Sequence, residues 1–507
     1  MLVVPVVAAV LVFARRVERL ETGPDAGVFV GMVRNLRSLR SLTSPTDQYW
    51  VRLSPAETVD RLGRLPIPDF GPMYSALVAV VPAPLELAFV IVHVAAVFGA
   101  VASVGYLAFR ACSVVAVGMA AQVLALWGPF SPDRFFAHGR PLELYASIGS
   151  DGLAVATLLT GMAVAVAAGG RTSRTAWRWF GIAVAALLAA SVLTRYAMAG
   201  AVLGLLVAFV VSRLRWDDRR WPWPVAALVV AGSWQIVVYP LLVDGAGPKS
   251  LVAHRGDIAP LGVTMAGWVG LDVSGAVASA VVIALGLVLV GIAVVGSPGG
   301  VVALCAMAAA GHLAVVVVSR QVLDAVLNLR EERHVLLIRF LLAVLVVSGL
   351  HHLLRLALRR RPTGLVRRAT AGAAALAAGI GAIAAGGWPW PDPLVAAAPT
   401  LPVDQWLTAH GSPPVLSNLS DNWYTQTGVP AADVPRTVEA STGRPRDVAA
   451  EIAALAASSR TVAQAYWPDF FEGVDLRTVP CAVVVDTWTG PELAGFELSI
   501  LDLSGCT

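Results

Sequence analysis

Acidic and basic side chains at the ends of apolar segments are the residues of this chain that could do chemistry. Asp25 follows a Gly-Pro turn after the first apolar run, and apolar residues recur behind it at helical spacing. A carboxylate at the boundary between lipid and water could take a proton from a substrate hydroxyl. Aspartate also caps helices often, and a cap is the structural alternative here. We therefore take Asp25 as the candidate general base.

Arginine supplies a second kind of chemistry, because its planar guanidinium binds phosphate with parallel hydrogen bonds. Arg195 stands beside Tyr196 at the turn between two apolar segments, and Arg330 and Arg333 precede a later segment. We expect these three arginines to bind a phosphate group. The alternatives are a membrane-interface anchor for Arg195 with Tyr196, and a solvated charge cluster for Arg330 and Arg333.

Other polar residues occupy comparable positions and form a secondary set. The secondary candidates are Asp151, Asp69, Tyr74, Tyr196 and His334. Asp151 begins an apolar segment, where it could also serve as a helix cap. Asp69 could be an ordinary loop residue. His93 and His312 lie inside apolar segments, and we expect both to be packed core histidines.

The elements that must position these residues are membrane helices. The chain has 507 residues, of which 57% are hydrophobic and only 14% are charged. A soluble protein of this length would carry nearer a quarter of charged residues. The composition therefore predicts an α-helical polytopic membrane protein. The formal net charge of +4 is modest and does not suggest a nucleic-acid partner.

About eleven segments are apolar enough to cross a bilayer, although the first is short for a crossing. They are residues 2–14, 85–109, 112–128, 151–168, 179–194, 196–212, 223–242, 275–295, 301–319, 335–353 and 369–386. The segments predict a multi-span membrane domain over residues 1–386, with a long first loop at 15–75.

Arginines concentrate in alternate loops between these segments, which places them on one side if the segments simply alternate. The positive-inside rule assigns that side to the cytoplasm. Arg15, Arg16 and Arg19 flank the first segment on the opposite side and argue the other way, but long loops weigh less in the rule. The sequence therefore predicts a cell-membrane protein with a cytoplasmic N-terminus and an outward-facing first loop and tail.

The tail, residues 387–507, is more polar and predicts a small extracytoplasmic α/β domain. A helical stretch at 446–459 precedes strand-like runs at 461–466 and 479–487. Cys481 and Cys506 lie in this tail and could pair if it is extracytoplasmic. Cys112 and Cys305 lie in apolar segments, and we expect both to be small core residues.

The order of the motifs resembles the GT-C superfamily of integral-membrane glycosyltransferases, particularly the bacterial branch related to protein mannosyltransferases and aminoarabinose transferases. The matching stretches are Asp25–Phe29, Gly71–Tyr74, Ser150–Leu153, Leu193–Tyr196, Arg333–Leu337, and Val415–Asn418 with Tyr424–Gly428. Three positions depart from the family pattern. Ala26 replaces the glutamate of eukaryotic-type members, Asp151 stands where glutamate is usual, and His334 stands where tyrosine is usual.

The resemblance implies transfer of a sugar from a polyprenyl-phosphate donor to an extracytoplasmic protein, lipid or glycan acceptor. It implies direct displacement with inversion, with Asp25 as the base and Arg195 and Arg333 neutralising the leaving phosphate. We expect no cofactor and no metal. Two alternatives stay open: a transporter or flippase of lipid-linked sugars, and a polymerase or ligase of surface polysaccharide. A transporter would be expected to show repeated halves or broken helices, and the sequence indicates neither.

Overall fold

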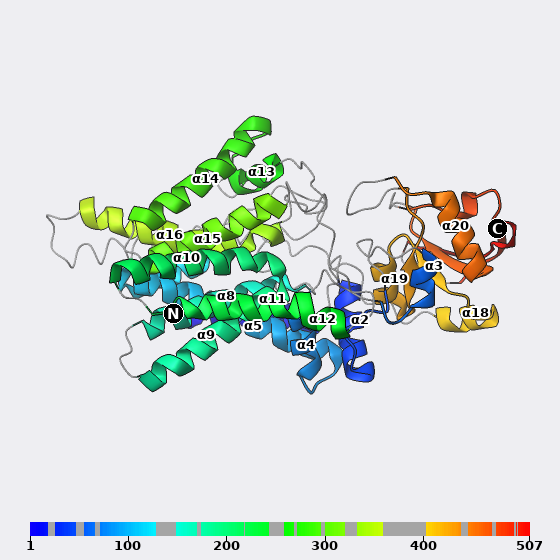
Figure 1. Ribbon diagram of the computed structural model, residues 1–507, viewed down its shortest axis with the longest axis horizontal. Coiled ribbons are helices and arrows are strands. Elements are labelled where there is room, and N and C mark those ends of the chain that lie inside the picture. Colours follow the sequence, from blue (N-terminus) through cyan, green and yellow to red (C-terminus); the bar gives the residue numbers. More distant parts are fainter. Residues whose placement is uncertain are drawn as a thin grey trace. The chain divides into compact units, whose positions relative to one another are not determined.

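A computed structural model divides the chain into two compact units, shown with their elements in Figure 1. We name them the membrane unit (Met1–Glu18, Glu86–Ile236, Ala253–Asp392) and the sheet unit (Arg19–Leu85, Val237–Val252, Pro393–Thr507). The first loop and the tail, which are far apart in the sequence, belong to the same unit. The structure describes residues 1–18, 26–46, 55–65, 71–127, 149–169, 174–216, 219–242, 258–267, 271–295, 300–319, 332–357, 402–437, 445–468, 473–490, 493 and 495–506.

Long apolar helices build the membrane unit. Its main helices are α1 (Val3–Glu18), α5 (Leu85–Cys112), α6 (Val115–Trp127), α8 (Asp151–Ala168), α9 (Arg174–Thr194), α10 (Ala199–Trp216), α11 (Pro222–Ser233), α13 (Ala259–Gly267), α14 (Gly275–Val295), α15 (Val301–Val318) and α16 (Glu332–Ala357). Shorter pieces adjoin them: the 3₁₀ turn η1 (Tyr196–Met198) and the π-helical turn η2 (Trp234–Val238), whose last two residues fall in the sheet unit together with α12 (Tyr239–Leu242).

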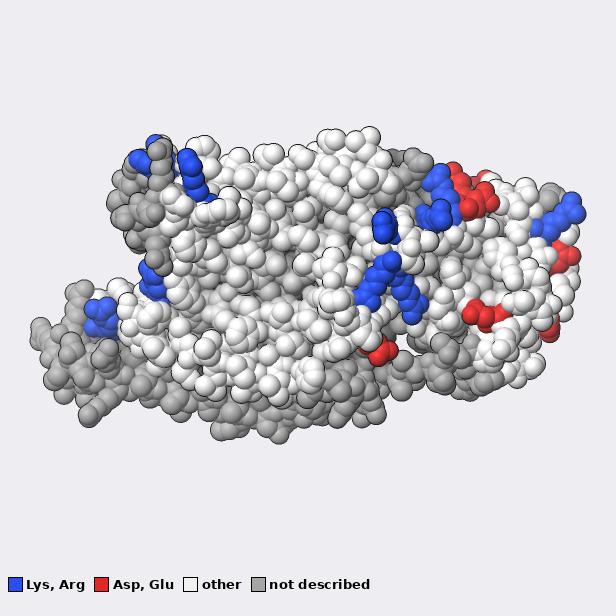
Figure 2. Space-filling model, turned by 90° about the horizontal axis from the view of Figure 1, so that it is seen from below, with Lys and Arg blue, Asp and Glu red and all other residues white. Residues whose placement is uncertain are grey.

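Within the described part of the chain, eight helices are long and apolar enough to cross a membrane. They are Leu85–Cys112, Asp151–Ala168, Thr175–Thr194, Tyr196–Leu214, Pro222–Leu242, Gly275–Val295, Val301–Val318 and Val335–Leu356. Each coincides with a segment expected from the sequence. The expected segments at 2–14 and 112–128 form apolar helices too short for this criterion, and the one at 369–386 lies outside the described residues. On the face drawn in Figure 2, a broad stretch of the surface is white, and the blue and red residues lie on either side of it.

Glycines let two of these helices approach closely. A side chain on Gly200 would place its Cβ 2.4 Å from the carbonyl oxygen of Gly311, and one on Gly204 would place it 2.0 Å from that of Met307. Gly200 and Gly204 are spaced as in the small-xxx-small pattern of membrane helix pairs. Their lack of a side chain brings α10 and α15 into backbone contact. The contact lies close to the turn that carries Arg195, because α10 begins directly after that turn.

The sheet unit contains a five-stranded sheet in the order β2-β1-β3-β5-β4. β1 pairs in parallel with β2 and β3, whereas β5 pairs antiparallel with β3 and β4. The strands are β1 (Val415–Ser417), β2 (Ala431–Asp433), β3 (Thr461–Tyr466), β4 (Val483–Thr487) and β5 (Glu497–Asp502). The helices of the tail are α18 (Val403–Ala409), α19 (Ser420–Thr427), α20 (Val448–Ser458), η4 (Leu476–Thr478) and η5 (Ser504–Cys506). The helix and strand runs expected in the tail are present, but the second strand begins at Val483 and not at residue 479.

Successive strand residues point to opposite faces of the sheet, and both faces of the strands β1, β3 and β5 are buried. The edge strand β4 is exposed along its whole length. Val415 belongs to the core on one face, with Trp423 of α19 buried against the ring of Phe496. Leu416 belongs to the core on the other face, which α20 covers with Leu455. The tail thus has a two-faced core in which α19 and α20 cover opposite faces of the sheet.

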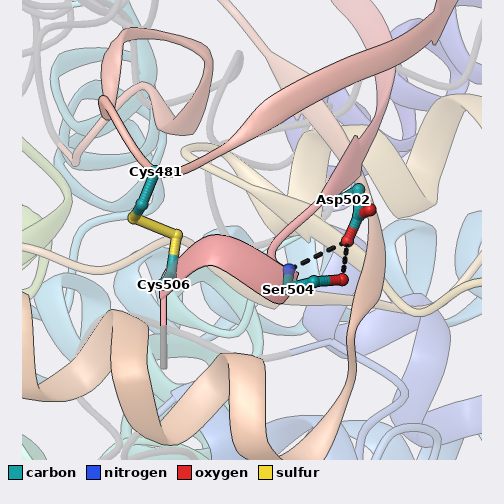
Figure 3. The surroundings of a disulfide bond; sticks show 4 residues. All are labelled: Cys481, Asp502, Ser504 and Cys506. Carbon is teal, nitrogen blue, oxygen red and sulfur yellow. Dashed lines mark hydrogen bonds between the residues drawn. A yellow bond between two sulfur atoms is a disulfide. The ribbon is translucent and has the colours of Figure 1, made fainter.

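A disulfide joins Cys481 to Cys506 and ties the last residues of the tail to the segment before β4 (Figure 3). Ser504 supports the same corner, because its backbone N–H and its hydroxyl both donate to Oδ1 of Asp502. The pairing considered from the sequence is therefore present, and it fits an oxidising compartment.

The first loop contributes α2 (Ala26–Leu39), α3 (Pro55–Asp60) and α4 (Pro72–Val80) to the sheet unit. Gly27 of α2 packs so closely on α19 that an added Cβ would lie 2.1 Å from the backbone oxygen of Asp421. Two turns further on, Arg34 donates a 3.1 Å hydrogen bond to the hydroxyl of Tyr424. Arg37 donates to backbone oxygens of residues 78, 79, 81 and 83, which caps the C-terminal end of α4. Helix α2 is thus attached to α19 through Gly27 and Arg34, and to α4 through Arg37.

Candidate functional site

A carboxylate stands at the start of one membrane helix. Asp151 is the first residue of α8 and only 7% of its surface is exposed. The preceding residue, Ser150, occupies the N-cap position without a side-chain capping bond. The first turn of a helix has unpaired backbone N–H groups and the positive end of the helix dipole, which favour a negative charge. Asp151 is therefore a buried acid with local backbone support.

A sharp change of backbone direction presents an arginine to that acid. Helix α9 ends at Thr194, and Arg195 adopts an extended conformation (φ −147°, ψ 111°) before η1 begins. The end of α9 is fastened to α8, since the hydroxyl of Ser191 donates a 2.7 Å hydrogen bond to the backbone oxygen of Ala154. The helix is thus interrupted, between α9 and η1, beside the first turn of α8.

Arg195 and Asp151 form an ion pair at this position. The Nε atom of Arg195 lies 3.0 Å from Oδ1 of Asp151, and the two side chains are 18% and 9% exposed. Breaking such a buried pair by removing one partner is costly, because it leaves the other charge without compensation. The pair therefore directs the guanidinium of Arg195, which is the cationic group best suited to phosphate.

The next two residues of the same turn are held by other elements. The hydroxyl of Tyr196 donates to Oε1 of Gln235, which belongs to the π-helical turn η2. The backbone oxygen of Ala197 lies 3.2 Å from Nδ1 of His312 on α15. We call Arg195, Tyr196 and Ala197 the arginine turn. Elements from three different parts of the chain contact it.

The arginine turn lies at one end of the membrane helices. At the other end of α8, Arg220 donates a 3.2 Å hydrogen bond to the backbone oxygen of Ala165. The 18 residues of α8 rise about 1.5 Å each, so Asp151 and Arg220 are separated by most of the thickness of a bilayer's hydrocarbon core. The site is therefore placed at a membrane surface, where a lipid phosphate would be found. Which side of the membrane that surface faces stays a prediction.

The remaining candidates divide into three groups. Asp25, Asp69 and Arg330 lie outside the described residues. Arg333 and His334 are in the first turn of α16, and their side chains are also outside the description. Tyr74 is fully buried in the sheet unit, with its ring 4.8 Å from that of Phe29 in an edge-on contact. The structure thus brings together Asp151, Arg195 and Tyr196 among the predicted residues.

Gln235 was missed by the sequence analysis, although a signal was present. It is a polar residue within the apolar segment Pro222–Leu242, and polar residues in such segments are uncommon and often functional. The π-helical turn around it is a second structural signal, since single π-turns within helices are frequent at functional sites. His312 was expected to be a packed histidine, and its 1% exposure agrees with that.

Clusters of side chains that could bind a metal ion are the remaining feature of a candidate site. In the part of the chain that the structure describes, no group of three or more His, Cys, Asp and Glu residues could hold a metal ion. Carboxylates and imidazoles are the usual protein ligands for the metals of glycosyl and phosphoryl chemistry. A metal-independent reaction stays a proposal, to be tested by chelation.

Comparison with solved structures finds a protein of similar fold. The chain is similar to the crystal structure of ArnT from Cupriavidus metallidurans bound to undecaprenyl phosphate, with a TM-score of 0.53 and 12% sequence identity. The alignment covers 98% of this chain and 97% of that chain. No protein-family model matches the chain, and no curated protein matches it either. At this identity the likeness shows the fold alone.

The fold class is thereby established. The chain is a helical polytopic membrane protein with an ArnT-like fold and a small α/β region near its C-terminus. The likeness extends over both units, so the sheet unit is part of the shared architecture. It leaves the reaction, the substrate and the orientation of the termini to be tested.

Proposed function

We propose that this protein transfers a sugar from a polyprenyl-phosphate donor to an acceptor on the extracytoplasmic side of the membrane. The observation that carries the proposal is the Asp151–Arg195 pair, buried at one end of the membrane helices. A polyprenyl-phosphate donor carries its phosphate at that depth. The similar protein ArnT was solved with a lipid phosphate bound, which supports a ligand of this class.

The proposed reaction is a direct displacement at the anomeric carbon. The acceptor oxygen forms a bond to that carbon while the bond from the carbon to the phosphate oxygen breaks. The electron pair of the broken bond stays on the phosphate, and the acceptor's hydroxyl proton goes to a base. The leaving group is already a good one, so it needs neutralisation of charge rather than a general acid.

Arg195 is proposed to neutralise the leaving phosphate. Its guanidinium is oriented by Asp151 before any ligand arrives, so little reorganisation is needed during the reaction. Arg333 and Arg330 are proposed to add charge to the same phosphate. Asp25 is proposed as the base, a role typically worth about a hundredfold to ten-thousandfold in rate.

The experiment is sugar transfer by the purified protein in lipid nanodiscs. A panel of polyprenyl-phosphate sugars, each labelled in the sugar, is incubated with protein, lipid and glycan acceptors, and both the labelled product and the released lipid phosphate are measured. Transfer of single sugars, lost in Asp25→Asn and kept in the presence of EDTA, supports the proposal. Transfer of whole chains would indicate a polymerase or ligase. Translocation of the lipid-linked sugar across a vesicle without transfer would indicate a flippase, and either result would overturn the proposal.

A further inference from the structure

We infer that His312 is a positioning residue for Arg195, acting through the backbone of the arginine turn. The inference deepens the proposed function and rests on it for the role of Arg195 in binding phosphate. It does not rest on that function for the contact itself. The relevant atoms belong to the membrane unit, on α15, η1 and α8.

The contact is a buried hydrogen bond with a defined direction. Nδ1 of His312 lies 3.2 Å from the backbone oxygen of Ala197, and the histidine is 1% exposed. A carbonyl oxygen can only accept a hydrogen bond, so Nδ1 must be the nitrogen that carries the hydrogen. The geometry therefore assigns both the donor atom of His312 and its acceptor.

This contact completes a three-point attachment of consecutive residues. Asp151 of α8 holds the side chain of Arg195, and Gln235 of η2 holds the hydroxyl of Tyr196. His312 holds the backbone of Ala197, two residues after the arginine. Local backbone hydrogen bonds also hold the turn, from the N–H of Arg195 to the oxygen of Ser191 and from the N–H of Met198 to the oxygen of Arg195. The hydrogen bond from His312 adds an attachment of the turn's backbone to a separate helix, α15.

Close helix packing explains why a histidine on α15 can reach the turn. The neighbouring residue Gly311 lies against α10, where a Cβ on Gly311 would be 2.2 Å from the backbone oxygen of Gly200. Gly200 is the second residue of α10, directly after η1. The glycine contact thus sets the depth of His312 relative to the arginine turn. A larger residue at either glycine would separate the two helices and lengthen the hydrogen bond.

The test uses two substitutions at His312 and one matched control. His312→Asn keeps an amide N–H near the position of Nδ1, whereas His312→Leu fills a similar volume and removes the donor. Cys305→Ala is the control, because it removes a fully buried side chain from the same helix two turns away. All variants are made in the full chain and purified into nanodiscs.

The first readout is hydrogen–deuterium exchange of peptides that contain the arginine turn, which needs no activity. His312→Leu should raise exchange there, and His312→Asn should restore protection toward the wild-type level. Cys305→Ala should leave the arginine turn unchanged. Equal exchange in His312→Leu and Cys305→Ala would overturn the inference.

The second readout is binding of undecaprenyl phosphate, measured alone and in combination with Arg195→Ala. Loss of one hydrogen bond predicts about threefold to tenfold weaker binding for His312→Leu. In the Arg195→Ala background the same substitution should have no further effect, because His312 acts through Arg195. Additive losses would overturn the inference. If the wild-type protein does not bind the lipid phosphate, the proposed function fails, while the exchange experiment still decides whether His312 positions the turn.

Discussion

Arg195 reaches Asp151 from the end of the neighbouring membrane helix, and its Nε atom lies 3.0 Å from the Oδ1 atom of the carboxylate. Asp151 is the first residue of α8, and Arg195 directly follows the last residue of α9. The ion pair therefore joins the two helices at one end of the α8–α9 hairpin. The packing of these two helices therefore determines how the guanidinium of Arg195 is oriented.

We predict that Asp151→Ala lowers stability and loosens Arg195. Removing one partner of a buried pair typically lowers the free energy of unfolding by about 3–5 kcal/mol. Because Arg195 is partly exposed, we expect a loss near the lower end of that range. The measurement is the thermal unfolding midpoint in nanodiscs. Asp272→Ala is the control, since Asp272 is an exposed acid of the same unit. Equal midpoints for the two variants would show that the pair contributes nothing.

We predict that Gly27→Ala disrupts the contact between α2 and α19. The new Cβ would lie 2.1 Å from the backbone oxygen of Asp421, and backbone cannot move away as a flexible side chain does. Forced overpacking typically costs about 1–3 kcal/mol. Limited proteolysis of the first loop should accelerate in this variant. Gly291→Ala is the control, because Gly291 lies within α14 with no atom near the added Cβ; equal proteolysis in both variants would refute the prediction.

We predict that reducing the Cys481–Cys506 disulfide destabilises the sheet unit. The bridge spans 25 residues, for which the loss of chain entropy in the unfolded state predicts about 3 kcal/mol. Cys506→Ser should lower the protection of β4 and β5 against hydrogen exchange. Cys112→Ser removes a free thiol instead and should leave those strands unchanged. Unchanged protection in Cys506→Ser would contradict the prediction.

We predict acid sensitivity at Asp475. Burial opposes the charged form of this carboxyl, but hydrogen bonds from Arg477 outweigh burial and lower its pKa below the ordinary value. Since the pKa is lower in the folded chain, Asp475 contributes stability above its unfolded pKa and loses that contribution as the pH falls through its folded pKa.

The measurement is the acid-unfolding profile of β3 and β5 by hydrogen exchange in the full chain. Asp475→Asn should lose stability at neutral pH and show a flatter profile below about pH 4. Asp404→Asn replaces an exposed carboxyl on α18 and serves as the control. A profile for Asp475→Asn as steep as that of the wild type would exclude this carboxyl as the cause.

Sequence reasoning was strongest where one local pattern decides the outcome. The membrane helices follow from long runs without charge, as in Gly275–Val295, because a bilayer accepts little else. Asp151 at the start of α8 and β3 at Thr461–Tyr466 were predicted for similar reasons. In each case, neighbouring residues in the sequence carry the information.

Contacts between distant segments could not be predicted in this way. The hydrogen bond from Tyr196 to Gln235 depends on a π-helical turn, and the one from His312 to Ala197 depends on close packing of two helices. Hydrophobic periodicity indicates which face of a helix is buried but not its depth against a neighbour. The contact of Gly27 with α19 joins segments from opposite ends of the chain, and no spacing in either segment specifies the other.

The central claim is that the arginine turn binds the phosphate of a lipid donor. Its most direct measurement is the dissociation constant of undecaprenyl phosphate for wild type, Arg195→Ala and Arg178→Ala in nanodiscs. Arg178 is an exposed arginine near the opposite end of the same helix, α9, and its variant should bind like the wild type. Loss of charged hydrogen bonds predicts about tenfold to hundredfold weaker binding for Arg195→Ala. Equal affinity of Arg195→Ala and the wild type would contradict the account.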